Sequence, residues 1–156
     1  MKSLTLFRHA KTERDSSTGS DFDRRLIERG QQDARRMGEE MRALGLEFDL
    51  ILSSPAARAA ETAELAGLTP RFDERIYDAA TSELLSIVRS ADNGIQRLAM
   101  VGHNPGFERL AGKLIGQFVE MPTGSLIEIG LPVEQWAEVG EAAGSLVRFI
   151  KPKVLR

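Results

Sequence analysis

Residues 4–11 read Leu-Thr-Leu-Phe-Arg-His-Ala-Lys, and they set the pattern for the rest of the chain. The apolar first half has the length of a short buried strand, and it runs directly into Arg8 and His9. Residues 98–105 repeat this arrangement, because an apolar run is followed there by Gly-His-Asn-Pro with the histidine at position 103. In both places a histidine follows a predicted strand.

Strand and helix patterns alternate outward from this stretch. Short apolar runs predict further strands at residues 50–52, 72–77, 98–101, 126–131 and 146–150. Helical spacing of apolar residues predicts helices at residues 26–44, 56–66, 82–89 and 105–115. This alternation favours an α/β fold, a three-layer α/β/α sandwich with a mostly parallel central sheet. The last two strands have no long helix between them, so we expect an antiparallel pairing there.

The bulk composition is typical of a globular protein. With 156 residues, 42% hydrophobic and 28% charged, the chain is expected to form a single domain over residues 1–156. A net charge of −2 provides no basic field for nucleic acid. No apolar run approaches the ~20 residues of a membrane span. The chain has no cysteine, which excludes disulfides and thiolate nucleophiles and fits a reducing cytoplasm.

The two histidines are expected to meet at one edge of the sheet. Open α/β sheets bind ligands beyond the carboxyl ends of their strands, and parallel strands would bring His9 and His103 there together. A single histidine is as readily a surface or core residue. Two histidines at strand ends, each in a polar, turn-forming setting, favour a functional site.

Arginines are predicted to gather at the same edge. Arg8 has the same strand parity as Leu4 and Leu6, so its side chain should point toward the face of the sheet that they cover. A buried arginine needs an anionic partner there. Arg58 lies in the first turn of the helix that Ser54 and Pro55 are expected to begin, with the serine as cap. Its guanidinium would add to the attraction of that helix N-terminus for phosphate. Arg24 is expected to reach in from the loop before the long helix.

Two histidines with two or three arginines indicate phosphoryl transfer through a covalent enzyme intermediate. One imidazole attacks phosphorus, while the arginines and the second imidazole neutralise charge on the phosphoryl oxygens. The histidines could instead bind a metal together with Asp or Glu, but Arg8 and Arg58 would repel the cation. We therefore expect neither a metal nor a cofactor.

At these residues the sequence resembles the histidine phosphatase superfamily. Residues 6–11 are similar to its Arg-His signature, in the Arg-His-Ala-Lys form common in SixA-type phosphohistidine phosphatases. The resemblance continues in the same order through five further motifs, at residues 21–24, 28–30, 53–62, 101–105 and 152–153.

The resemblance implies a phosphoglycerate mutase-like fold and a role for each matching residue. His9 would be the nucleophile and His103 the second catalytic histidine. Arg8 and Arg58 would be catalytic and, with His103, would complete the phosphate pocket. Arg24 would be a further substrate contact.

The sequence departs from the SixA-like pattern in two places. Arg25 and Ile27 replace the proline and threonine of the usual Arg-Pro-Leu-Thr-Glu-Arg-Gly stretch, which removes the threonine that would cap the long helix. Glu74 could align with the glutamate that the phosphoglycerate-mutase-like branch places near its active site as general acid. The residues around Glu74 do not resemble that branch closely, which favours a surface position.

The resemblance implies an enzyme that removes phosphate from the phosphohistidine of a phosphotransfer protein. A second possibility is a phosphatase of the same superfamily acting on a small phosphorylated molecule. The short chain argues against it, because little sequence is left to build a specificity cap. A third is a phosphate-binding module without turnover, against which the retention of both histidines and both core arginines argues.

Overall fold

Six strands form one mixed sheet in the computed structural model, which describes residues 1–156. The strands are β1 (Lys2–Arg8), β2 (Leu50–Ser53), β3 (Arg71–Phe72), β4 (Arg97–Gly102), β5 (Leu126–Leu131) and β6 (Ser145–Ile150). They lie in the order β3-β2-β4-β1-β5-β6. The strands β3, β2, β4 and β1 run parallel to one another, whereas β5 is antiparallel to both β1 and β6. The predicted parallel sheet with an antiparallel pairing near the end of the chain is therefore confirmed.

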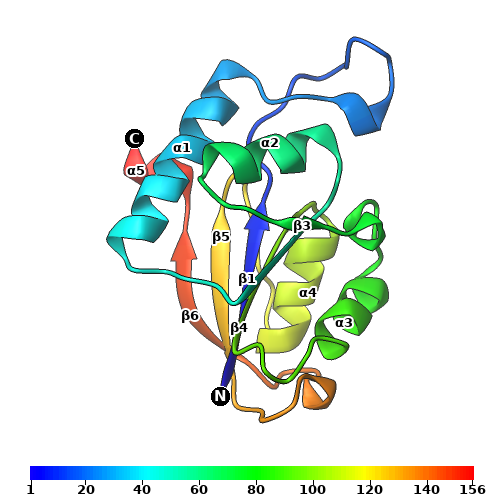
Figure 1. The fold of residues 1–156 in the computed structure, drawn as a ribbon, viewed down its shortest axis with the longest axis vertical. Coiled ribbons are helices and arrows are strands. Elements are labelled where there is room, and N and C mark those ends of the chain that lie inside the picture. The colour runs from blue at the N-terminus through cyan, green and yellow to red at the C-terminus, as the bar shows by residue number, and fades with distance from the viewer.

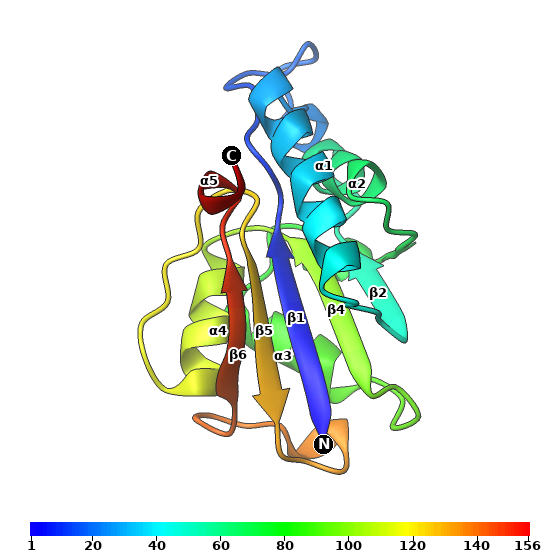
Figure 2. The same cartoon turned by 90° about the vertical axis from the view of Figure 1, so that its left-hand side faces the viewer.

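Helices cover both faces of the sheet (Figures 1 and 2). The helices are α1 (Glu28–Ala43), α2 (Ala57–Leu65), α3 (Thr81–Arg89), α4 (Gly106–Ile115) and the short α5 (Pro152–Leu155). α1, α2 and α5 lie on one face, and α3 and α4 lie on the other (Figure 2). This confirms the three-layer α/β/α arrangement. No helix combines the length and the apolar character that crossing a membrane requires.

Side-chain alternation along β1 divides the interior into two apolar cores. Leu4 and Leu6 are completely buried in the larger core, together with residues of α3 and α4. Phe7 points the opposite way, into a smaller core that includes Met37 of α1 and Ala63 of α2. Burying one large apolar side chain contributes about 1.5–3 kcal/mol, so both cores fix the position of β1.

Two predicted elements differ from the structure. The strand predicted at residues 72–77 ends at Phe72, the last residue of β3: the side chain of Asp73 accepts a hydrogen bond from the backbone N–H of Arg75, which starts a 3-10 helix at Glu74–Ile76. The helix predicted to begin at Ser54 and Pro55 begins at Ala57, and no side chain caps it. The expected cap is not formed: the hydroxyl of Ser54 accepts a hydrogen bond from the backbone N–H of Ala56, which precedes the helix, and it also lies 2.7 Å from Nε2 of His103.

Three parallel strands end side by side at one edge of the sheet. Arg8 of β1 pairs with Gly102 of β4, and Ser53 of β2 pairs with Val101 of β4. The residues that follow these strands therefore emerge next to one another. Backbone hydrogen bonds continue this pairing beyond the strands, from the N–H of His9 to the carbonyl of Gly102 at 3.0 Å and from that of Ser54 to the carbonyl of Val101 at 2.9 Å.

Candidate active site

His9 and His103 lie next to each other where β1 and β4 end. Their ring centroids are 5.4 Å apart, and the ring planes are inclined at 53°. The two histidines are adjacent because β1 and β4 pair in parallel, with Arg8 and Gly102 as partners in the register. The structure thus brings together the two histidines that the sequence placed at strand ends.

The imidazole of His9 has one free nitrogen. Its Nδ1 lies 2.8 Å from the carbonyl oxygen of Ala10, an acceptor, so Nδ1 carries the proton and Nε2 keeps its lone pair. Burial lowers the pKa of His9 to about 3, and the neighbouring His103, Arg8 and Arg58 also lower it. His9 is therefore neutral at pH 7, which is the form that can act as a nucleophile.

His103 is also neutral, and its two nitrogens have different surroundings. Nε2 lies 2.7 Å from the hydroxyl oxygen of Ser54. Nδ1 is buried without any hydrogen-bond partner. Burial lowers the pKa of His103 to about 4, with Arg58 as the next cause.

Arg8 extends toward the face that its strand parity predicts. Its Nη1 donates to the carbonyl of Met121 at 2.8 Å, and Met121 belongs to the same core as Leu4 and Leu6. Its Nε is buried and has no partner. Burial lowers the pKa of this guanidinium, although Glu108 opposes that effect.

Arg58 lies in the first turn of α2 and is 7% exposed. Its Nη1 donates to the carbonyl of Asp21 at 2.8 Å, and its Nη2 donates to the carboxylate of Asp21 at 3.0 Å. The remaining nitrogen, Nε, is buried without a partner. Asp21 thus holds the end of the guanidinium and leaves its Nε available.

Arg24, the further contact suggested by the sequence, is engaged within its own loop. Its three nitrogens donate to the carbonyl of Glu13, to the carboxylate of Asp21 at 2.9 Å and to the hydroxyl of Thr12. Its link to Arg58 and the two histidines is therefore indirect, through the carboxylate of Asp21. The structure does not bring Arg24 into contact with either histidine.

Asp21 and Tyr77 are parts of the site that the sequence did not single out. The carboxylate of Asp21 accepts hydrogen bonds from Arg58, from Arg24 and from the hydroxyl of Tyr77 at 2.8 Å. The bond from Tyr77, followed by the two arginines, holds the pKa of Asp21 well below its usual range. The Tyr77 ring meets His103 edge-on, with centroids 5.7 Å apart. The signal available in the sequence was the place of Asp21 in the 21–24 motif.

Three buried hydrogen-bonding atoms of this cluster lack a partner: Nε of Arg8, Nε of Arg58 and Nδ1 of His103. An arginine Nε–H is always a donor, so two of the three require an acceptor. Buried groups of this kind indicate a ligand or an ordered water. An oxyanion would satisfy them and would also complement the two guanidinium charges.

The chain contains no group of three or more His, Asp or Glu side chains placed to hold a metal ion. Glu74 is exposed at the start of its 3-10 helix, and no hydrogen bond or ion pair connects it with either histidine.

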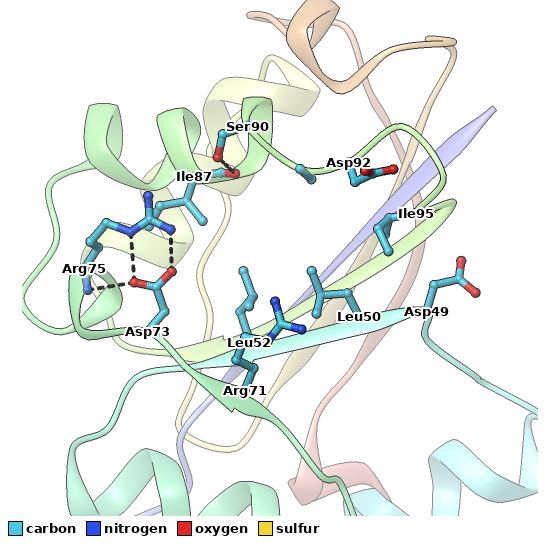
Figure 3. A pocket seen from close by; sticks show the side chains of 11 residues that line it. Asp49, Leu50, Leu52, Arg71, Asp73, Arg75, Ile87, Ser90, Asp92 and Ile95 are labelled. Atoms are coloured by element: carbon cyan, nitrogen blue, oxygen red, sulfur yellow. Dashed lines mark hydrogen bonds and ion pairs between the residues drawn. The ribbon is translucent and has the colours of Figure 1, made fainter.

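A cleft of about 480 Å³ lies elsewhere, beside β2, β3 and the C-terminal end of α3 (Figure 3). Its lining contains no histidine. The charged side chains Asp73 and Arg75 in it bond to each other through two hydrogen bonds (Figure 3). None of His9, His103, Arg8 and Arg58 lines this cleft, so it is separate from the two histidines and their arginines.

Comparisons with known proteins agree with the geometry. Residues 4–84 match the family model of the histidine phosphatase superfamily (branch 1). An uncharacterized chloroplastic protein of Arabidopsis thaliana is 30% identical over 156 residues, which cover 90% of this chain and 72% of the relative.

Two solved structures illustrate the range of similar folds. A protein of Agrobacterium tumefaciens assigned as phosphohistidine phosphatase SixA is 27% identical, with a TM-score of 0.83 over 97% of this chain and 98% of that one. A phosphoserine phosphatase of Entamoeba histolytica, solved with 3-phosphoglyceric acid, has a TM-score of 0.70 over 100% of both chains. At 15% identity, the second likeness concerns the fold alone.

Proposed function

This chain belongs to branch 1 of the histidine phosphatase superfamily, and on that premise we propose that it hydrolyses phosphohistidine in a phosphotransfer protein, with His9 as nucleophile. The observation that carries the proposal is the pairing of two neutral histidines with three unpartnered polar atoms in one cluster. The resemblance to the Agrobacterium protein supports the choice of substrate.

The reaction has two steps. Nε2 of His9 attacks the phosphorus, the bond from phosphorus to the substrate nitrogen breaks, and the phosphoryl group is transferred to His9. Arg8, Arg58 and His103 donate hydrogen bonds to the phosphoryl oxygens, which is where most of the catalysis of phosphoryl transfer lies. Water then attacks the phosphorus of phosphorylated His9, which releases inorganic phosphate and restores the imidazole. The arginines neutralise charge that a metal ion would neutralise in other phosphatases.

The surroundings of the cluster favour a leaving group that needs little assistance. Asp21 stays ionised, because Tyr77 and two arginines hold its pKa low, so it has no proton to give near pH 7. Glu74 is exposed, and no hydrogen bond or ion pair joins it to either histidine. An alkoxide leaving group is very basic and needs a proton from a well-placed acid. The leaving group of phosphohistidine is an imidazole, which departs readily because the pKa of its conjugate acid is near ~6.5. This supports cleavage of P–N bonds over alkyl phosphate esters.

The test compares kcat/KM for a phosphohistidine protein, a nitrophenyl phosphate and an alkyl phosphate. We expect that order of efficiency, little change in Glu74→Gln and no loss of activity after exhaustive chelation. Efficient alkyl-ester hydrolysis that collapses in Glu74→Gln would identify a small-molecule phosphomonoesterase instead. Vanadate binding without turnover of any substrate would identify a phosphate-binding module.

A further inference from the structure

Ser54 is a completely buried residue that follows β2, and its hydroxyl oxygen makes two contacts. It accepts a hydrogen bond from the backbone N–H of Ala56 at 3.2 Å. It also lies 2.7 Å from Nε2 of His103. No other polar atom bonds to this hydroxyl.

The direction of the hydrogen bond to His103 follows from counting protons. A serine hydroxyl has one hydrogen to donate, and a buried hydroxyl hydrogen needs an acceptor. The N–H of Ala56 is a donor and cannot accept it, which leaves Nε2 of His103. Nε2 is therefore the acceptor, and in the neutral ring the proton lies on Nδ1.

We propose that Ser54 is a positioning residue that fixes His103 as the Nδ1–H tautomer, so that this N–H donates a hydrogen bond to the phosphoryl group. The proposal rests on the proposed function in that a phosphoryl group is the ligand of the site. Ser54 itself touches no reacting atom and acts through His103.

The tautomer matters because His103 is neutral at pH 7. A protonated imidazolium would donate from both nitrogens, but burial lowers the pKa of His103 to about 4, so only one nitrogen carries a proton. Nδ1 is the nitrogen without a partner in the protein. If the proton were on Nε2, Nδ1 would present a lone pair to the phosphoryl oxygens and would repel them.

Strand pairing holds Ser54 in the place that this role requires. Ser53 pairs with Val101 in the parallel register of β2 and β4, and the N–H of Ser54 donates to the carbonyl of Val101 at 2.9 Å. His103 follows Val101 by two residues, so the two side chains emerge together. The hydroxyl therefore acts from a fixed backbone position.

The direct test is long-range ¹H–¹⁵N NMR of the imidazole nitrogens in the uniformly labelled protein near pH 7. The chain has two histidines, so the spectrum of His9→Asn contains His103 alone. We expect the resonances of an unprotonated Nε2 and a protonated Nδ1. A protonated Nε2 in the wild-type protein would overturn the proposal, whatever the activity of the enzyme.

Variants test the consequence for the phosphoryl group. Ser54→Ala should shift His103 toward the Nε2–H tautomer, weaken binding of inorganic phosphate and lower kcat/KM by about 10- to 100-fold, the range known for residues that orient metal-binding histidines. Ser54→Thr retains a hydroxyl and should restore part of the loss. Ser53→Ala is the matched control, because the hydroxyl of Ser53 is equally buried but donates to the carbonyl of Ser54.

Each outcome has a separate meaning. A folded Ser54→Ala protein that keeps the Nδ1–H tautomer and its phosphate affinity would contradict the role of Ser54. Failure of the wild-type protein to hydrolyse phosphohistidine, with the Nδ1–H tautomer and phosphate binding present, would contradict the proposed function and leave the role of Ser54 supported. If Ser54→Ala does not fold, the tautomer of the His9→Asn protein decides.

Discussion

His9 and His103 stand 5.4 Å apart, ring centroid to ring centroid, at the carboxyl ends of two adjacent parallel strands. Each ring is neutral, and each has one nitrogen without a hydrogen-bond partner, Nε2 in His9 and Nδ1 in His103. One free nitrogen is suited to attack a phosphorus atom and the other to bind an oxygen of the same group.

Neither histidine should titrate near pH 6.5 in the folded protein. Burial lowers the pKa to about 3 for His9 and to about 4 for His103, so the folded rings bind protons only in strong acid. The unfolded chain binds them near ~6.5, so acid below that pH should also reduce the stability of the fold. The Cε1–H resonances, followed by NMR from pH 8 downward, measure both pKa values.

Phosphate should move both titrations upward, because a bound dianion favours the protonated rings. The unfolded protein is the control for ordinary titration. A transition near pH 6.5 from either ring of the folded, ligand-free protein would show that the ring is not buried as described.

Arg58→Lys should lower kcat by about 100-fold, the usual effect of removing one donor that binds a transition state. The guanidinium bonds to Asp21 through both Nη atoms while its Nε stays free. A lysine side chain has one nitrogen and cannot bind both Asp21 and the phosphoryl group in the geometry of the guanidinium. Steady-state kinetics checks this, with the exposed Arg35→Lys as control. Near-normal turnover of Arg58→Lys would mean that Arg58 does not bind the phosphoryl group.

Asp21→Asn should bind inorganic phosphate roughly two- to fivefold more tightly. The carboxylate of Asp21 shares Arg58 with the incoming phosphate, and because the Asp21 side chain is 52% exposed, solvent screening limits the effect of its charge to about 0.2–1 kcal/mol. Asparagine keeps an oxygen that can accept from Arg58 but removes the negative charge. Competitive inhibition by phosphate measures the effect.

Asp23→Asn is the matched control for Asp21, because the carboxylate of Asp23 bonds to Thr18 within the same loop. Weaker phosphate binding by Asp21→Asn would show that the carboxylate mainly orients Arg58. Equal effects of the two substitutions would show that the loop charge as a whole is responsible.

The sequence predicted the parts of this site that depend on local pattern. Apolar runs located β1 and β4, and a parallel sheet then placed His9 and His103 at one edge. The Ser-Pro pattern predicts a helix cap at Ser54, because serine is common at the cap position and proline at the first position of a helix. Its contact with His103 spans 49 residues and depends on the register of β2 with β4, which no local pattern contains.

The hydrogen-bond partners of Arg24 and Asp21 could not be predicted from the sequence for a similar reason. A loop arginine can reach in several directions, and the hydrogen bonds to Thr12 and Glu13 decide which one it takes. The bond between Tyr77 and Asp21 joins residues 56 positions apart. Residues 72–77 were predicted as a strand from their apolar members, but the side chain of Asp73 turns the backbone after two strand residues.

Arg156→Met should lower the melting temperature by several degrees. Asp33 of α1 is 2% exposed, and its carboxylate accepts two hydrogen bonds from Arg156, at 3.2 and 2.8 Å. Removing the arginine leaves a buried carboxylate without its partner. Thermal unfolding measures this, with the exposed Lys153→Met as control.

The double variant Asp33→Asn, Arg156→Met should recover part of the lost stability, since it removes the uncompensated charge as well. An unchanged melting temperature in Arg156→Met would show that the ion pair does not fasten the C-terminal residues to α1.

The central claim is that His9 carries the phosphoryl group between substrate and water. Rapid quenching of the protein with a ³²P-labelled phosphohistidine substrate tests it most directly, because phosphohistidine is stable in base and labile in acid. We predict base-stable, acid-labile label on His9 of the wild-type protein and none on His9→Asn. Label that persists in His9→Asn, that maps to another residue, or that is absent during active turnover would contradict the account.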